Sequence, residues 1–318
     1  MSAHDSAETR AVKLRDIPLV KRLAENGAIL DCELYFTQNS SSASLFKLLV
    51  PHGGVHTLLA RVERQTVVGQ FRLKADTHCA QIAYIAPGLQ PDDPDDTPWL
   101  HLLDALAVEA GRRGVHLLAA EVDENSPLFK TLRSASYSIY ARQEIWRCTP
   151  DGRSADSGDL ALQEATEADL PEIQMLYAGI VPRLVQQIAG YPVAPGGLVY
   201  RHAGRVAGYI AVTEGRAGAF LMPHLHPDVF GEAAAIMAAA AARSSRGGKQ
   251  AVYVRVRRYQ DWLDDALVEL GFDLVAQQAV LVKHIAAGVR SAAFAPLPHS
   301  LETVHSPVQP PTSGIIDS

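Results

Sequence analysis

Residues 264–272 read Asp-Asp-Ala-Leu-Val-Glu-Leu-Gly-Phe, and this stretch predicts the last helix of a repeated unit. Its leucines continue an apolar stripe at helical spacing. The helix closes on Gly271 and Phe272, a strand pattern follows over residues 274–285, and another precedes the helix over residues 251–256. The local order is therefore strand, helix, glycine and aromatic residue, strand.

The same order occurs in the first half of the chain. A buried strand is predicted over residues 115–122, the next helix closes on Ala135-Ser136-Tyr137, and a final strand follows over residues 139–146. The closing points Ser136 and Gly271 lie 135 positions apart. We therefore predict two diverged copies of one fold within the chain.

Earlier segments of the two halves also correspond. Each half has an Asp-apolar-Pro entry to an amphipathic helix, with Asp as the cap and Pro in the first turn, then a strand with a central Gly, a strand ending in Pro, and a long helix. The matched segments are 16–18 and 169–171, 67–71 and 206–210, 82–87 and 219–223, and 99–113 and 231–246. Strands alternating with helices around a central hairpin imply a mixed α/β sheet in each half.

The length of 318 residues agrees with two domains at roughly 150 residues each. Residues 149–159 are rich in turn formers and predict a linker. The last thirty or so residues carry scattered prolines and predict a disordered tail. The predicted organisation is a flexible N-terminus (1–9), an N-terminal domain (10–148), the linker (149–159), a C-terminal domain (160–286) and the tail (287–318).

Composition excludes several classes of protein. Hydrophobic residues make up 47% and charged residues 20%, which is typical of globular chains. A net charge of −6 argues against a nucleic-acid-coating protein. The three cysteines form no CxxC pair that could hold zinc or a redox disulfide, and the N-terminal residues have no signal-peptide pattern. The most apolar helical run, residues 233–242, has only half the length that a membrane-spanning helix needs. We expect a cytoplasmic protein without nucleic-acid or membrane partners, and its oligomeric state stays open.

The repeated order of elements resembles the GCN5-related N-acetyltransferase (GNAT) superfamily, in its tandem two-domain form. The resemblance covers about residues 10–147 and 160–285, and Asn125, eleven residues before Ser136, stands where the family often has Asn. It implies two tandem acyl-CoA N-acyltransferase-like domains. It also implies an acetyl-CoA-dependent N-acetyltransferase acting on a small amine.

The family binds acetyl-CoA at a Gln/Arg-x-x-Gly-x-Gly/Ala turn before the long helix, where backbone N–H groups and the helix dipole hold the pyrophosphate. In the second half Gly231 and Ala233 match this turn, while Asp228 replaces the first residue and Glu232 adds a charge. In the first half no glycine is present, and Pro98 removes a donor. The resemblance therefore places acetyl-CoA in the second half. The implied contacts are Met222, His224, Gly231, Glu232 and Ala233.

The residues that would move protons differ from the family pattern. Many members use a Tyr four residues before the Gly of Gly-Phe, but Leu132 and Leu267 stand there. Tyr259, two helical turns before Leu267, is the candidate acid. His224 and His226 alternate at strand spacing, which predicts that both point to one face and that either is a candidate base.

Other polar residues complete the candidate site. Glu214, at a hairpin tip, is a third candidate base, acting through water, and Glu33 is expected near the acceptor side of the first half. Arg255 and Arg257 share one face and could bind an anionic acceptor or a CoA phosphate. The alternative is surface pairing with the nearby Asp261, Asp264 or Asp265. Two histidines alone make an incomplete metal site, so no metal is predicted.

Three functions stay open at this point. The first is acetyl transfer to an unidentified amine. The second is a non-catalytic tandem GNAT-fold binding or interaction protein, which the substituted phosphate turns and the leucines at the acid position favour. The third is transfer of an aminoacyl or longer acyl group, as in distant tandem members of the superfamily.

Overall fold

The computed structural model describes residues 8–38, 54–73, 78–93, 95–149, 161–190, 196–245 and 250–285. Most of the predicted N-terminal segment 1–9 and linker 149–159, and the whole predicted tail 287–318, lie outside the described residues. The described residues all belong to one compact unit by their contacts. Within the described part of the chain, no helix is long and apolar enough to cross a membrane.

The elements of the first half follow the predicted order. Its strands are β1 (Glu8–Ala11), β2 (Ala28–Ile29), β3 (Val55–Val62), β4 (Gln65–Leu73), β5 (Cys79–Ala86), β6 (Leu117–Asp123) and β7 (Ser138–Cys148). Its helices are the short η1 (Leu14–Asp16), α1 (Ile17–Ala24), α2 (Cys32–Thr37), α4 (Thr97–Arg112) and α5 (Pro127–Ser134).

The second half repeats this order. Its strands are β8 (Gln163–Glu164), β9 (Gly197–His202), β10 (Arg205–Glu214), β11 (Gly218–Leu225), β12 (Ala251–Arg257) and β13 (Asp273–His284). Its helices are η2 (Glu167–Asp169), α6 (Leu170–Ile180), α7 (Arg183–Ala189), η3 (Pro227–Glu232), α8 (Ala233–Ser244), η4 (Arg258–Leu263) and α9 (Asp264–Glu269). The repeated mixed sheet with helices confirms the predicted fold class.

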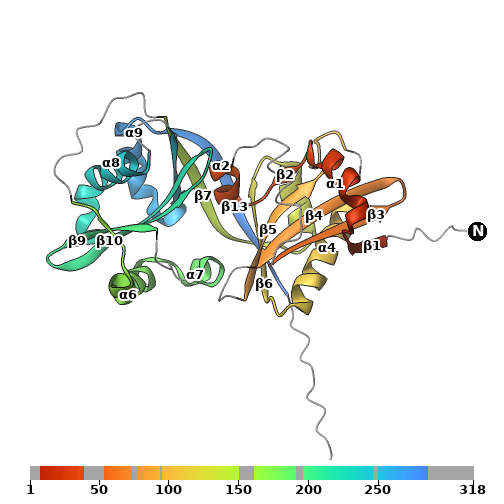
Figure 1. The fold of residues 1–318 in the computed structure, drawn as a ribbon, viewed down its shortest axis with the longest axis horizontal. Coiled ribbons are helices and arrows are strands. Elements are labelled where there is room, and N and C mark those ends of the chain that lie inside the picture. Colours follow the sequence, from red (N-terminus) through yellow and green to blue (C-terminus); the bar gives the residue numbers. More distant parts are fainter. Residues whose placement is uncertain are drawn as a thin grey trace, which may run out of the picture. The chain divides into compact units, whose positions relative to one another are not determined.

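All these strands belong to one mixed sheet in the order β1-β3-β4-β5-β6-β13-β7-β12-β11-β10-β9-β8, with β2 paired to β5. The last strand of each half completes the sheet of the other half. β13 pairs antiparallel with β6, Gln278 opposite Asp123, and β7 pairs antiparallel with β12, Gln143 opposite Arg257. β7 and β13 also pair with each other, side by side between the two halves (Figure 1). We call this arrangement the strand exchange.

The residues that follow the last helix of each half, which the sequence comparison aligned, have the same backbone conformation. Ser136, after α5, has φ = 66°, and Gly271, after α9, has φ = 77°. This left-handed conformation ends many helices and favours Gly, so Ser136 adopts it at some cost. The equivalent geometry supports the alignment of the two copies.

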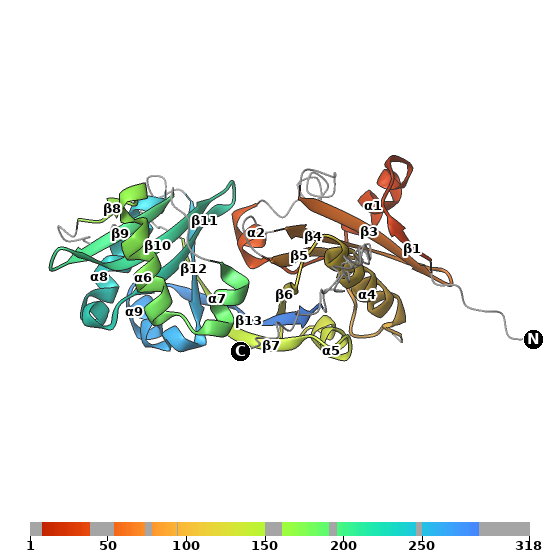
Figure 2. The ribbon, with the colours of Figure 1, turned by 90° about the horizontal axis from the view of Figure 1, so that it is seen from below.

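Helices cover both faces of the sheet. In the first half, α4 packs on β3 and β4 (Figure 2), and its buried residues recur at helical spacing as Trp99, Leu102, Leu103 and Leu106. In the second half, α8 and α9 contribute to the main core, and α6 packs on β10 and β11. Helix α2 of the first half packs on β11 of the second. The two halves therefore meet through a helix as well as through exchanged strands.

The two Asp-apolar-Pro segments start helices as predicted, but the aspartates bond differently. Asp16 and Asp169 occupy the N-cap positions of α1 and α6 without capping them through their side chains. Each carboxylate instead accepts a hydrogen bond from the backbone N–H three residues earlier, from Lys13 at 2.8 Å and Thr166 at 2.7 Å. The reason is a short helical turn that precedes each helix and uses the same Asp.

Candidate active site in a cavity between the two halves

A cavity of about 550 Å³ lies between the first and second halves, which is the size of a site for a small molecule. Its walls come from α2, β4, β5 and β6 on one side and from α6, α7, β11 and β12 on the other. Apolar residues line much of it, together with five charged side chains. They are Glu33, Arg72, Glu121, Arg255 and Arg257, with His224 beside them.

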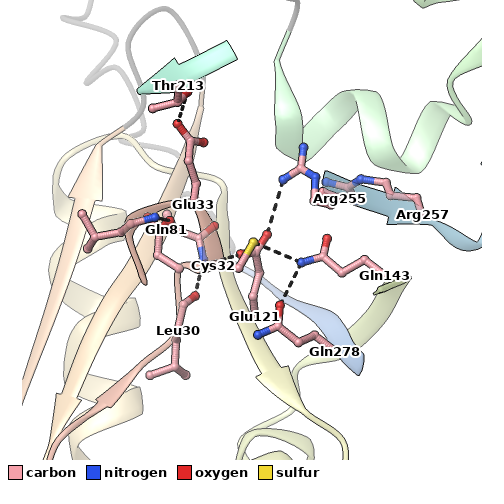
Figure 3. A network of polar contacts seen from close by, with 12 residues as sticks. Leu30, Cys32, Glu33, Gln81, Glu121, Gln143, Thr213, Arg255, Arg257 and Gln278 are labelled. Carbon is pink, nitrogen blue, oxygen red and sulfur yellow. Dashed lines mark hydrogen bonds and ion pairs between the residues drawn. The ribbon is translucent and has the colours of Figure 1, made fainter. Parts of the chain in front are cut away.

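An ion pair between the halves lies among the residues that line the cavity (Figure 3). Oε1 of Glu121, on β6, lies 3.8 Å from Nη1 of Arg255, on β12. Oε2 of Glu121 accepts a hydrogen bond of 2.7 Å from the backbone N–H of Cys32. Burial acts to raise the pKa of Glu121, but the Arg255 guanidinium and the hydrogen bonds from Cys32 outweigh it and lower the pKa. The carboxylate therefore stays ionised.

The exchanged strands supply a pair of glutamines beside this ion pair. Gln143 of β7 donates through Nε2 to Oε1 of Gln278 on β13, at 3.1 Å, and to Sγ of Cys32, at 3.4 Å (Figure 3). Burial, followed by the nearby Glu121 carboxylate, raises the pKa of the Cys32 thiol well above its ordinary value. A protonated, buried thiol is a poor nucleophile, so Cys32 has a structural role.

Arg257 is buried without a partner for one of its nitrogens. Arg257 is 5% exposed, and its Nη1 has no hydrogen-bond partner in the described part of the protein. Burial, followed by the neighbouring Arg255 guanidinium, lowers the pKa of Arg257 to about 10. The backbone of Arg257 is held by Gln260, whose Oε1 accepts its N–H at 3.2 Å and whose Nε2 donates to the Pro223 carbonyl at 2.6 Å.

His224 faces the same cavity from β11. Its ring lies edge-on to Tyr177, with 5.1 Å between centroids, and its Nδ1 is buried without a hydrogen-bond partner in the described residues. Burial, followed by the positive charges of Arg255 and Arg257, lowers the pKa of His224 to about 3. The imidazole is therefore neutral at neutral pH.

The lowered pKa of His224 makes its contribution to stability depend on pH. An unfolded His titrates near 6.5, so between pH 6.5 and 3 the unfolded chain binds a proton that the folded chain does not. The contribution is complete above pH 6.5 and is lost as the pH falls, at about 1.4 kcal/mol per pH unit. We expect the free energy of unfolding of wild type to fall, relative to that of His224→Gln, by about 2 kcal/mol when the pH is lowered from 7 to 5.

Urea unfolding of both proteins at the two pH values measures this change. Asp264, whose pKa burial raises to about 6, shifts stability in the opposite direction, but it is common to both proteins and cancels in the difference. A stability difference that does not vary with pH would mean that His224 titrates normally.

The cavity brings together six of the residues that the sequence singled out. Met222, His224, Arg255, Arg257 and Tyr259 all line it. Glu33 also lines it, and its Oε1 accepts a hydrogen bond of 2.7 Å from the hydroxyl of Thr213 in the second half. Arg255 pairs with Glu121 and so does not use the aspartates of η4 and α9 that were its alternative partners.

His226 and Glu214 lie elsewhere. Strand β11 ends at Leu225, so His226 begins the turn η3 and does not share a face with His224, contrary to the expectation from strand spacing. The His226 side chain is exposed, with Nδ1 3.2 Å from Oδ2 of Asp228. Glu214 is exposed at the end of β10 and does not line the cavity.

The predicted phosphate turn is also separate from the cavity lining. Gly231, Glu232 and Ala233 lie where η3 meets α8. The Glu232 carboxylate accepts a hydrogen bond from the Tyr200 hydroxyl and lies 3.6 Å from Nδ1 of His202. Of the two carboxylates expected beside the phosphates of acetyl-CoA, Asp228 and Glu232, these contacts therefore engage Glu232.

Sequence reasoning missed Glu121, Arg72 and Asp31. Arg72 pairs with the buried Asp31, whose Oδ1 accepts the Leu34 N–H at 3.0 Å and so begins α2. The sequence does contain a signal for Glu121, because it is a charged residue within an otherwise apolar strand. A charged residue is seldom buried unless it is paired, so this position indicates a buried ion pair. The identity of its partner was not visible, since Arg255 is 134 positions away.

The two halves differ at the gap between their parallel strands. In the first half, β5 and β6 pair only from Cys79 to Gln81, and beyond that point Leu30 fills the gap. Leu30 donates to the Ala83 carbonyl at 3.0 Å and accepts from the Glu121 N–H at 2.9 Å. The first half thus closes its gap with its own backbone.

In the second half the corresponding gap faces the cavity. β11 and β12 pair from Gly218 to Leu221, and the residues beyond, Met222 and His224 on β11 and Arg255 on β12, line the cavity. A side-chain hydrogen bond from Gln260 to Pro223, described above, takes the place of the backbone that fills the first gap. The Gln260 side chain therefore bridges this gap, from the Arg257 N–H on β12 to the Pro223 carbonyl on β11, while Met222, His224 and Arg255 line the cavity beside it.

Comparison with known proteins gives the fold. No protein-family model matches the chain, and no curated protein matches it significantly. Among solved structures, a GCN5-related N-acetyltransferase from Sphaerobacter thermophilus is 12% identical, with a TM-score of 0.56 over 88% of this chain and 96% of that one. An acetyltransferase described as putative from Pyrococcus horikoshii is 14% identical, with a TM-score of 0.52 over 89% and 91%.

A third solved structure is itself a tandem protein. It is a tandem GNAT protein from the clavulanic acid biosynthesis pathway, 14% identical, with a TM-score of 0.51 over 88% of this chain and 99% of that one. These likenesses extend over most of both chains at low identity. They confirm the predicted GNAT fold, including its tandem form.

Proposed function

We propose that this chain, which has the tandem fold of GNAT acetyltransferases, is an N-acyltransferase that transfers an acetyl group from acetyl-CoA to a small amine. The observation that carries the proposal is the divergence of β11 and β12 beyond Leu221, where a single side chain, that of Gln260, bridges the gap and Met222, His224 and Arg255 line the cavity. In the GNAT fold this gap admits the pantetheine arm. The second half is therefore the proposed acetyl-CoA-binding half, and the cavity is the proposed acceptor site.

The first half does not fit acetyl-CoA. Leu30 fills its gap, as described above. At the start of α4, Oδ2 of Asp96 accepts a hydrogen bond of 2.8 Å from the Thr131 hydroxyl, which ties this turn to α5. Pro98, in the first turn of α4, has no N–H to offer a phosphate.

The second half fits better. A Cβ built on Gly231 meets no other atom within 4 Å, so there is room for a ligand against the backbone at the start of α8. The N–H groups at this helix start are suited to a pyrophosphate. Glu232 accepts a hydrogen bond from Tyr200 and lies near His202, so one of the two carboxylates at the turn is engaged with protein partners.

The residues of the cavity suit an amine acceptor. Acetyl-CoA, when bound, supplies the acetyl group as a reactive thioester. The Glu33 and Glu121 carboxylates attract the ammonium form of the acceptor, which must lose a proton before it becomes a nucleophile. His224 is neutral and offers a nitrogen lone pair to that proton, although its low pKa makes it a weak base. Burial raises the pKa of Tyr259, so its hydroxyl stays protonated and can donate a proton.

Gly231→Glu tests the location of acetyl-CoA. The substitution adds a carboxylate where the backbone would meet the pyrophosphate, and open space around Gly231 allows the variant to fold. We expect calorimetry to show at least tenfold weaker binding of acetyl-CoA, equivalent to about 1.4 kcal/mol. Gly179→Glu is the matched control, because Gly179 on α6 also has open space around it and is far from the turn in sequence.

Equal affinity of wild type and Gly231→Glu would place acetyl-CoA away from the start of α8. Absence of binding at millimolar acetyl-CoA, together with no release of free thiol in a screen of amines, would overturn the proposed enzyme function.

A second candidate is a non-catalytic binding or interaction protein with the tandem GNAT fold. The observations that favour it are the two carboxylates at the proposed phosphate turn, Asp228 and Glu232, and Leu267 at the position where many family members have the acid Tyr. The calorimetric experiment separates the two candidates, because only the enzyme needs to bind acetyl-CoA.

A further inference from the structure

The cavity contains one cationic and one anionic side chain that take part in no ion pair of the described residues. Nη1 of Arg257 lacks a hydrogen-bond partner, although the residue is only 5% exposed. Glu33 takes part in no ion pair within the described part of the chain, and its one hydrogen bond there to another side chain comes from the Thr213 hydroxyl. Both residues line the same cavity but belong to different halves.

Folding alone does not account for Arg257. A buried guanidinium is costly unless it is paired, and a second guanidinium, Arg255, lies beside it. Arg255 has a carboxylate partner in Glu121, whereas no ion pair of the described residues includes Arg257. An unsatisfied buried donor at a cavity wall suits a ligand that brings its own acceptor.

The planar fork of an arginine fits a carboxylate in a bidentate manner. The flanking Arg255 adds positive potential to this end of the cavity. Glu33, on α2, brings negative charge from the opposite half, where a ligand ammonium would be favoured. The cavity therefore presents separate sites for one anionic and one cationic group.

We infer that the acceptor is a zwitterion of the amino-acid class, whose carboxylate binds Arg257 and whose amine faces Glu33. This inference rests on the proposed function only for the ligand's role as acetyl acceptor, because the ligand would bind the cavity whether or not an acetyl group is transferred. The size of the cavity allows a side chain in addition to the two charged groups.

Matched pairs of amino acids and amines test the inference without acetyl-CoA. Thermal unfolding is followed with each of the twenty amino acids, and with phenethylamine, histamine and cadaverine as the decarboxylated partners of phenylalanine, histidine and lysine. We expect at least one amino acid to raise the melting temperature at millimolar concentration. The amine that lacks the carboxylate of this amino acid is expected to bind at least tenfold more weakly. Where that amine is not one of these three, it is synthesised.

Two variants locate the carboxylate. Arg257→Gln is expected to lose at least tenfold in affinity for that amino acid, and to melt at the same temperature as wild type or higher without ligand, because it removes an unpaired buried charge. Arg257→Lys keeps the charge without the fork and is also expected to bind more weakly. Arg258→Gln is the control, since Arg258 is adjacent but exposed and does not line this cavity.

Equal binding of an amino acid and its decarboxylated amine would overturn the inference, and so would unchanged binding by Arg257→Gln. Failure of all twenty amino acids to bind would do the same. The binding of acetyl-CoA is measured separately, so these results leave the proposed function to its own test.

Discussion

Replacement of Arg255 by Met is expected to lower the free energy of unfolding by about 3 kcal/mol or more. Glu121 is ionised and buried, and Arg255 is its one ion-pair partner within the described residues. The substitution leaves a buried carboxylate without a cation, and removal of one member of a buried pair typically costs about 3 to 5 kcal/mol. Urea denaturation at pH 7 measures the loss.

Arg257→Met is the matched control for this prediction. It removes a buried arginine from the same strand, two residues away, but one that has no carboxylate partner in the described structure. We expect it to leave stability unchanged or to raise it. The double variant Glu121→Gln/Arg255→Met should recover part of the loss, because no charge is then stranded. Equal destabilisation by Arg255→Met and Arg257→Met would show that packing of the arginine stems, and not the ion pair, is responsible.

Separation of the two halves into two polypeptides is expected to have an even larger effect. The strand exchange means that residues 1–154 alone lack β13, the partner of β6, and residues 155–318 alone lack β7, the partner of β12. Val280, Leu281 and Val282 of β13 are at most 2% exposed. Loss of three such aliphatic side chains removes about 5 kcal/mol or more, which is comparable to the whole stability of many domains.

Expression of the two polypeptides, separately and together, measures this effect. Each is expected to be insoluble or unfolded when produced alone, and the two are expected to co-purify in equal amounts when produced together. The control is the intact chain with a protease site inserted near residue 155, which should stay associated after cleavage. A soluble fragment 1–154 with a cooperative unfolding transition of its own would contradict the prediction.

The sequence could predict the fold because the signals are local. The helix ends marked by Ser136 and Gly271, the helix starts marked by Pro18 and Pro171 in the first turn, and the alternating strands each depend on neighbouring residues. The strand exchange could not be predicted in this way. β7 and β13 have similar patterns of apolar residues. These patterns therefore do not specify which of the two strands pairs with β6 and which with β12.

The candidate site was predictable in the second half and only in small part in the first. Met222, His224, Arg255 and Arg257 were identified from their places in a known order of elements. Glu121 was not, because its significance depends on a contact with the other half of the chain. The placement of His226 was wrong because the strand ends one residue before it, and strand ends are set by tertiary packing as well as by local pattern.

The strand exchange has a further consequence during synthesis of the protein. Asp123 of β6 pairs with Gln278 of β13, which the ribosome adds 155 residues later. At about 5 to 20 residues per second, the open edge of β6 waits roughly 10 to 30 s for its neighbour. An unpaired strand edge can join other chains, so the newly made first half passes through an aggregation-prone state that ends only when the last strand emerges.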